Sequence, residues 1–226
     1  MELDVKQAQE VQRVILPEPI ASLPGLAIES DYRPAREVGG DFFQIIPHLS
    51  DGSLLIVAGD VTGKGLQAGM LVALLVGAIR TSAQFDPNPL VVLNVLNQRL
   101  CGRSEASATC LALRIAADGE ATLANAGHVP PYLNCEPLEI GGSLPLGIIE
   151  DAAFSVIQFR FTVGDHLLMM SDGIAEATDL NGNLFGFERV LDLIRNSANA
   201  AAIATAAQNF GQEDDISVIS IIRTAA

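Results

Sequence analysis

Apolar positions along the chain group into runs whose lengths and flanking residues are typical of strands and helices. Five runs have the length of strands, and many are flanked by Gly, Asp or Asn: 53–59, 108–115, 154–161, 166–170 and 216–222. Four segments have the composition and length of helices: 65–83, 89–100, 187–196 and 199–210. Strands in groups and helices in pairs do not fit the alternating order of a parallel sheet. The pattern therefore favours an α+β fold of layered, mostly antiparallel sheets.

The start of the chain has a different pattern. Residues 2–16 have the spacing of a short helix that is stopped by Pro17. One face of this helix carries three apolar residues, Ala8, Val11 and Ile15. Such a helix is marginal alone in water, and its narrow apolar face suits a seam against a second copy or against the domain. We predict a linker or regulatory helix over 1–17 and one domain over 18–226.

Composition and charge narrow the classes of partner and compartment. The 226 residues are 49% hydrophobic, enough to bury the core of one domain. The net charge of −14 comes from 27 acidic and 13 basic residues, so we expect no nucleic-acid partner. The longest strongly apolar run, 70–79, has about half the length that crosses a bilayer, so we expect no membrane insertion. With no signal-peptide core in residues 1–19 and no CxxC pair, the sequence predicts a cytoplasmic protein.

Aspartates stand at the ends of several apolar runs. Asp60 ends LLIVAGD and Asp172 ends HLLMMSD, whereas Asp214 and Asp215 precede ISVISII. In neighbouring antiparallel strands the end of one lies beside the start of the next. These positions can therefore meet at one sheet edge, where Asp41 of EVGGDFF can join them. Crowded carboxylates repel one another and imply a cation between them, and ligands that are all oxygen favour Mg²⁺ or Mn²⁺ over zinc.

Each aspartate taken alone also has a purely structural interpretation. Asp172 with Gly173 is a common turn pair, and the two glycines before Asp41 can form a bulge or a turn. The tandem acids Asp214 and Asp215 can be a solvated strand start. These alternatives stay open for each residue, and the joint position of the aspartates at strand ends favours the metal site.

Two other phosphate chemistries are disfavoured. A P-loop over Gly59–Lys64 would need a glycine where the chain has Ala58, and Ser or Thr where it has Gly65. A cysteine nucleophile would want an arginine six residues further on, and none of the three cysteines has one.

Two basic or titratable residues near these motifs have open roles. His128 in NAGHVPPY could act as a general acid, but a histidine in a tight loop more often bonds the backbone. Lys64 could steer a phosphate, although a lysine at such a position is most often a solvated surface residue.

Six segments carry a family resemblance by their order and spacing: EVGGDFF, GDVTGKGLQAGM, LANAGHVPPY, LPLG, LMMSDGIAEA and EDDISVI. They resemble the successive motifs of the SpoIIE/RsbU-type metal-dependent serine/threonine phosphatases, the bacterial branch of the type 2C (PPM) fold. The resemblance covers residues 8–223 and includes the lead-in AQEVQRVILP. It implies a four-layer α/β/β/α sandwich of two mostly antiparallel sheets flanked by helices, and it makes 18–226 a PPM-type phosphatase catalytic domain.

The resemblance also implies a role for each matching residue. Asp60 would bridge two Mn²⁺ or Mg²⁺ ions, and the backbone carbonyl of Val61 would add a ligand. Asp41 would serve one ion, and Asp172 with Asp214 would serve the other. The catalytic residues would be Asp60 and Asp41.

Some positions are secondary candidates or depart from the family pattern. Of the tandem acids the pattern favours Asp214, so Asp215, Gly173 and Lys64 remain secondary candidates. Gln44 stands where many relatives have an acidic residue, and Gly69 replaces a frequent alanine. Neither departure falls on a ligand implied by the resemblance.

The function implied is hydrolysis of phosphoserine or phosphothreonine on a regulatory protein, by a hydroxide that bridges two divalent ions. The family suggests a STAS-type anti-sigma-factor antagonist as the substrate, a place in stress-response signal transduction, and a homodimer through the N-terminal helix. Two alternatives remain. The chain could be a metal-dependent phosphohydrolase for small molecules, or a non-catalytic binding module of the same fold.

Overall fold

The chain folds into two compact units, each with its own antiparallel sheet. The computed structural model describes residues 2–15, 22–48, 50–103 and 106–225. The end of the predicted helix at Leu16 and Pro17 lies outside these described residues.

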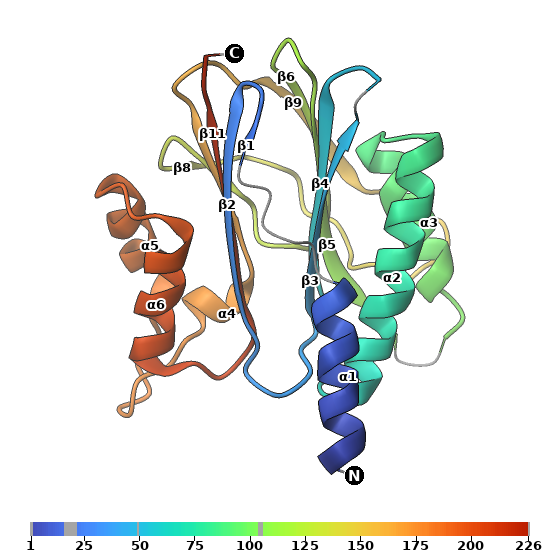
Figure 1. Ribbon diagram of the computed structural model, residues 1–226, viewed down its shortest axis with the longest axis vertical. Coiled ribbons are helices and arrows are strands. Elements are labelled where there is room, and N and C mark those ends of the chain that lie inside the picture. The colour runs from blue at the N-terminus through green and yellow to red at the C-terminus, as the bar shows by residue number, and fades with distance from the viewer. Residues whose placement is uncertain (1, 16–21, 49, 104–105, 226) are drawn as a thin grey trace. The chain divides into compact units, whose positions relative to one another are not determined.

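The first unit contains the N-terminal helix together with residues 40–128 and 139–161. Its five-stranded sheet has the order β3-β4-β5-β6-β9, and every neighbouring pair is antiparallel. The strands are β3 (Asp41–His48), β4 (Ser53–Val61), β5 (Ala108–Ile115), β6 (Glu120–Ala126) and β9 (Ser155–Arg160). The helices are α1 (Glu2–Ile15), α2 (Leu66–Phe85) and α3 (Pro89–Leu100). Figure 1 shows α2 and α3 side by side on one face of this sheet.

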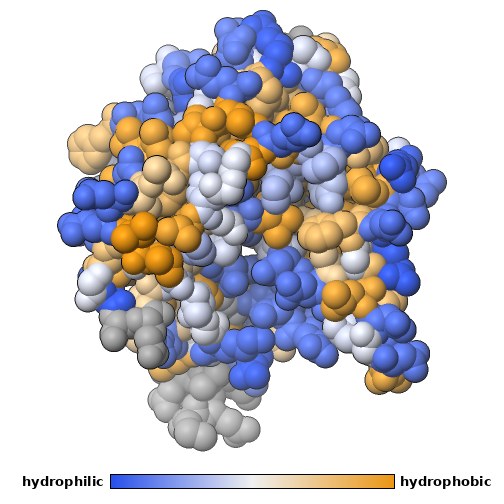
Figure 2. Space-filling view, turned by 180° about the vertical axis from the view of Figure 1, so that it is seen from behind, coloured by the Kyte–Doolittle hydropathy of each residue, from blue (hydrophilic) through white to orange (hydrophobic). Residues whose placement is uncertain are grey.

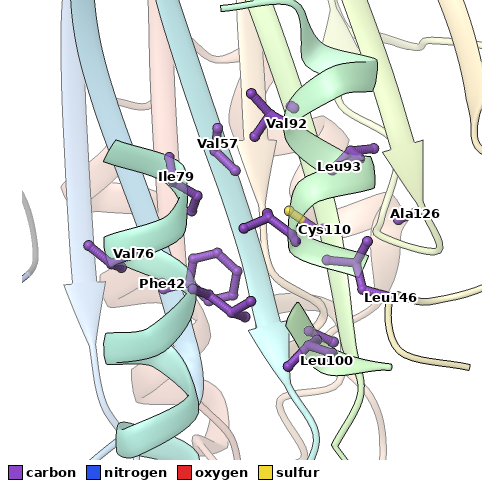
Figure 3. Packing of buried hydrophobic residues seen from close by; sticks show 14 of the residues in the cluster. Phe42, Val57, Val76, Ile79, Val92, Leu93, Leu100, Cys110, Ala126 and Leu146 are labelled. Atoms are coloured by element: carbon purple, nitrogen blue, oxygen red, sulfur yellow. The ribbon is translucent and has the colours of Figure 1, made fainter. Parts of the chain in front are cut away.

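The core of the first unit lies between that sheet face and the two helices. Phe42 and Val57 project from the strands toward Val76 and Ile79 of α2, whereas Cys110 of β5 lies on the side of α3 (Figure 3). All five are buried, and β4 is buried along almost its whole length. An apolar strand covered on both faces explains why LLIVAG reads as a continuous run instead of an alternating one.

Helix α2 is the one helix among the described residues that is long and apolar enough, by length and composition alone, to cross a membrane. Its buried residues include Val72, Leu75 and Ile79, which belong to the core of the first unit. This packing gives α2 the role of a core helix in the fold.

The second unit contains the segment that ends at Gly39, residues 129–138 and the chain from Thr162 onward. Its six-stranded antiparallel sheet has the order β1-β2-β11-β10-β7-β8. The strands are β1 (Ser22–Leu23), β2 (Leu26–Arg33), β7 (Tyr132–Leu133), β8 (Glu136–Pro137), β10 (His166–Met170) and β11 (Ile216–Arg223). The helices are α4 (Asp172–Ala175), α5 (Gly186–Arg195) and α6 (Ala200–Gly211).

Helix α6 packs on β2 and β11 and forms the core of the second unit with the neighbouring helices. The side chain of Asn199 accepts a hydrogen bond from the N–H of Ala202 at 2.8 Å, which caps the start of α6. Phe185 and Phe210 meet edge to face, with 5.3 Å between ring centroids. Ala200, Ala204 and Ala207 of α6 are buried in this core.

The architecture confirms the predicted α+β class, with two antiparallel sheets and helices packed on each. All four predicted helical segments are helices, and the five apolar runs coincide within two residues at each end with β4, β5, β9, β10 and β11. On the face shown in Figure 2, hydrophilic side chains predominate and apolar ones form separate patches between them.

Candidate metal centre

The first unit brings Asp41 and Asp60 together. Asp41 begins β3 and Asp60 lies one residue before the end of β4, and the two are directly opposite in the antiparallel register. Opposite residues in such a pair have Cβ atoms about 4.5–5.5 Å apart. The N–H of Val61 donates to the carbonyl of Gly40 at 3.2 Å, which extends the ladder beyond the pair. The register that pairs Asp41 with Asp60 is therefore fixed by the backbone of the sheet.

Gly40 leaves open the space beside this acid pair. A Cβ atom at Gly40 would lie 2.8 Å from Oδ1 of Asp60 and 2.9 Å from the carbonyl oxygen of Val61. The family resemblance assigns both oxygens as ligands. They lie close to the same point, the position that the Cβ atom of any residue other than glycine would occupy at position 40. The first unit thus fits a hard divalent cation, which prefers oxygen ligands.

The second unit brings Asp172 and Asp214 together. Asp172 follows β10 as the first residue of α4, and Asp214 precedes β11, the antiparallel neighbour of β10. Burial and the negative charge of Asp214 both raise the pKa of Asp172. A buried carboxylate whose ionisation is opposed by a second carboxylate fits a site that a cation neutralises.

Glu176 is a third acid near this pair that the sequence interpretation did not single out. Burial, followed by the charges of Asp172 and Asp214, raises the pKa of Glu176. Its position four residues after Asp172 was the signal available, because residues four apart share one helix face. Glu176 is exposed, so it contributes to the negative potential around the pair.

Hydrogen bonds across the strand ends hold the second acid pair. Ser171 donates its N–H to the carbonyl of Ser217, and the N–H of Ser217 returns a bond to Oγ of Ser171, both at 3.0 Å. Gly173 then passes so close to the next segment that a Cβ atom there would lie 2.1 Å from the carbonyl oxygen of Asp215. Gly173 is therefore required for a close backbone approach and offers no side-chain ligand.

The glycines after Asp60 make the turn that leads into α2. Gly63 and Gly65 have φ of 108° and 75°, a region that favours glycine, and α2 begins at Leu66. Lys64 lies between them with an exposed side chain.

His128 is buried, and its backbone is bonded on both sides by one side chain. Asn125 accepts from the N–H of His128 at 2.8 Å and donates to its carbonyl at 2.9 Å. Nδ1 of His128 is 2.9 Å from Oγ1 of Thr109, and Thr109 is directly opposite Asp60 in the register. These contacts favour the structural interpretation of His128, and the link through Thr109 to Asp60 was missed.

The acids come as two pairs, one in each unit. The expectation that they meet at the edge of one sheet is therefore wrong, because β3 and β4 belong to the five-stranded sheet and β10 and β11 to the six-stranded sheet. Among the described ranges, no group of three or more His, Cys, Asp or Glu side chains is arranged to hold a metal ion.

A groove of about 710 Å³ lies between α2 and α3, with Gly77 and Arg99 in its wall, and no predicted site residue lines it.

The sequence also matches a family model described as Stage II sporulation protein E (SpoIIE) over residues 50–224. The chain belongs to the SpoIIE family. The family assignment confirms the resemblance drawn from the six motifs. The SpoIIE-family chain is 27% identical over 190 residues to phosphoserine phosphatase RsbU of Bacillus subtilis. The aligned region covers 80% of this chain and 56% of RsbU. It spans about half the length of the curated relatives it matches.

Solved structures support the fold of this SpoIIE-family chain. The SiaA-PP2C domain of Pseudomonas aeruginosa matches with a TM-score of 0.81 and 21% identity, over 97% of this chain and 95% of that domain. RsbX in complex with magnesium matches with a TM-score of 0.69 and 16% identity, over 90% of this chain and 98% of RsbX. At these identities the likeness shows the PP2C fold alone.

Proposed function

We propose that this chain is a metal-dependent protein phosphatase that removes phosphate from phosphoserine or phosphothreonine. The observation that carries the proposal is the pairing of Asp41 with Asp60 and of Asp172 with Asp214 at the positions that the family motifs assign to metal binding. The SpoIIE family and the similarity to RsbU, a phosphoserine phosphatase, support the same activity.

The proposed ligands are all oxygen atoms. Asp60 would contact two ions and the carbonyl of Val61 would add to them, with Asp41 on one ion and Asp172 and Asp214 on the other. That both pairs serve one binuclear site follows from the family resemblance. An all-oxygen set suits Mn²⁺ or Mg²⁺, and the magnesium complex of RsbX supports this choice.

Two bound cations would lower the pKa of an attacking water and neutralise the phosphoryl oxygens. The chain's own contribution is to hold the carboxylates at fixed positions by sheet register and strand-end hydrogen bonds. Cys110 is fully buried, and burial raises the pKa of its thiol, so it cannot serve as a thiolate nucleophile. Cys101 and Cys135 are less buried, but neither has an arginine six residues further on, so direct attack by water without a covalent intermediate is the supported route.

The proposed substrate is a phosphorylated regulatory protein, of which a STAS-type anti-sigma-factor antagonist is the family's suggestion. A cytoplasmic place in stress-response signalling belongs to the same proposal.

The decisive test is hydrolysis of an aryl phosphate before and after removal of divalent ions. Chelation should abolish turnover, and Mn²⁺ or Mg²⁺ should restore it, whereas zinc should serve poorly. Activity that survives exhaustive chelation contradicts the metal mechanism. A phosphopeptide should then be turned over better than nucleotides and sugar phosphates. The reverse preference would favour the small-molecule phosphohydrolase, and no turnover of any ester would favour the binding module.

The role of the N-terminal helix as a linker and dimerisation element is a further part of the proposal. The last carbonyl of α1, at Ile15, accepts hydrogen bonds from Arg80 at 2.8 Å and Gln44 at 3.1 Å, and the Ile15 side chain packs against the first core. Val11 and Val14 are 58% and 80% exposed, and the side chain of Ala8 lies outside the described part. Ile15 thus contacts its own domain, which leaves Val11 and Val14 for a second copy.

The proposed dimer contact through Val11 and Val14 is tested by the double substitution Val11→Glu with Val14→Lys. The double variant should weaken self-association in light scattering and alter turnover, while Mn²⁺ affinity stays nearly constant. Val163→Glu, at a valine that is 66% exposed in the second unit, is the matched control. An unchanged mass with an unchanged rate would remove the dimerisation role.

A further inference from the structure

The tandem acids Asp214 and Asp215 differ in where their side chains lie. Asp214 is partly exposed and its charge acts on Asp172, whereas Asp215 is 7% exposed. Oδ1 of Asp215 accepts a hydrogen bond from the N–H of Ala35 at 2.8 Å, across 180 positions of sequence. A buried carboxylate is stable only when it is bonded, and this bond is charge-assisted.

The backbone of Asp215 is held on both sides, so the direction of its side chain is determined. Its N–H donates to Oδ1 of Asp214 at 3.0 Å, and its carbonyl accepts from Oγ of Ser171 at 3.2 Å. Nearby, Nε2 of Gln212 donates to the carbonyls of Asp214 at 3.1 Å and Arg33 at 2.7 Å. The start of β11 is thereby tied to the end of β2, just before Ala35.

The same carboxylate also contacts the far end of the segment that begins at Ala35. A Cβ atom at Gly39 would lie 2.4 Å from Oδ2 of Asp215 and 2.2 Å from Oη of Tyr32. One oxygen of Asp215 therefore bonds the beginning of segment 35–39, and the other lies against its last residue. The backbone of 35–38 forms bends without strand pairing, so it has no ladder of its own to fix it.

We infer that Asp215 is a positioning residue that anchors segment 35–39 and, through the backbone, sets the position of Asp41. Only Gly40 separates the anchored segment from Asp41, the residue that starts β3. The inference rests on the proposed function, in which Asp41 is a metal ligand. It assigns the two tandem acids different tasks: Asp214 binds metal, and Asp215 holds the chain that leads to Asp41.

The experiment compares Asp215→Asn with Asp215→Ala. The amide oxygen of asparagine can still accept from Ala35, so Asp215→Asn should keep turnover and Mn²⁺ affinity within about 3-fold of the original protein. Asp215→Ala removes the acceptor and should weaken Mn²⁺ binding and turnover by about 10- to 100-fold, as supporting partners of ligands do. Asp214→Asn is the matched control and should lose Mn²⁺ affinity although it keeps the shape of the side chain. Thermal unfolding verifies that each variant folds.

Amide hydrogen exchange of Ala35 in the metal-free protein gives a readout independent of activity. Asp215→Ala should speed this exchange at least about 10-fold, and Asp215→Asn should leave it nearly unchanged. If Asp215→Asn loses Mn²⁺ as Asp214→Asn does, Asp215 is a ligand and the inference is wrong. Faster exchange with unaltered Mn²⁺ binding would also overturn it, since the anchor would then be structural only. Failure of the proposed function would instead appear as a folded original protein that binds Mn²⁺ but hydrolyses no ester.

Discussion

The two acid pairs are held in different ways. Asp41 and Asp60 stand opposite each other on the neighbouring strands β3 and β4, so the hydrogen-bond ladder of the sheet sets their separation. Asp172 and Asp214 lie outside the strands, where side-chain bonds such as that of Ser171 to Ser217 and a close backbone approach at Gly173 hold them. The register of a pair on a ladder should withstand changes around it, whereas the spacing of a pair at strand ends depends on each individual contact.

The largest effect should come from the ladder pair itself. Asp60→Asn removes a charge that both ions would share, so turnover should fall by more than about 100-fold. Asp172→Asn and Asp214→Asn should come close to this loss, and steady-state rates at saturating Mn²⁺ measure all three. A smaller loss for Asp60→Asn than for Asp172→Asn would place the bridging role in the second pair.

Alanine substitutions at Gly173 and Gly40 should affect different properties, the first the stability of the fold and the second the binding of metal. Gly173→Ala sets a methyl group against the carbonyl of Asp215 and should lower the free energy of unfolding by about 1–3 kcal/mol. Gly40→Ala faces Oδ1 of Asp60 and should mainly weaken Mn²⁺ binding. Urea unfolding and calorimetry measure the two quantities. Gly142→Ala, where a Cβ would meet nothing within 4 Å, is the control. Equal losses of stability for Gly40→Ala and Gly173→Ala would contradict the contrast.

The smallest effect concerns charge in the metal-free protein. Because the pKa of Asp172 is raised above its ordinary value of 3.8 by burial and by Asp214, its ionised form destabilises the fold at pH 7. Asp172→Asn should therefore raise the free energy of unfolding in chelator at pH 7. The gain should shrink as pH falls through the folded-state pKa and vanish below 3.8.

Asp51 in the first unit supplies a control, because its substitution should change the free energy of unfolding in the opposite direction. Hydrogen bonds from Ser53, with a contribution from Arg114, lower the pKa of Asp51 to about 2. Asp51→Asn should reduce stability at pH 7, and the reduction should disappear as pH falls from 3.8 toward 2. The same sign for Asp51→Asn and Asp172→Asn at pH 7 would contradict the assigned causes.

The sequence predicted the parts of the fold whose cause is local. Apolar runs that end in aspartate predicted two strands, β4 before Asp60 and β10 before Asp172, because a buried strand needs continuous apolar residues. The strands β2 (LAIESDYR) and β6 (EATLANA) were not predicted, since polar or small residues interrupt their apolar pattern. β6 is a strand because neighbours on both sides complete its hydrogen bonds, and β2 is a strand because β11 pairs with it along its whole length.

The candidate ligands were predictable, but the contacts that position them were not. The bonds of Asp215 to Ala35 and of His128 to Thr109 join residues 180 and 19 positions apart. No periodicity encodes such contacts, because they arise only after the sheets have formed. The spacing of the acids could indicate a cation, but it could not distinguish the tasks of Asp214 and Asp215.

The burial of Cys110 has a consequence for how such a phosphatase behaves under oxidants. Peroxide attacks exposed thiolates and converts them to sulfenic acid, which inactivates phosphatases that rely on cysteine. Cys110 is enclosed in the first core and keeps its proton, and the proposed chemistry uses carboxylates, which peroxide does not oxidise. The proposed reaction needs no thiolate, so oxidation of a cysteine would not remove its nucleophile, in contrast to phosphatases that rely on cysteine.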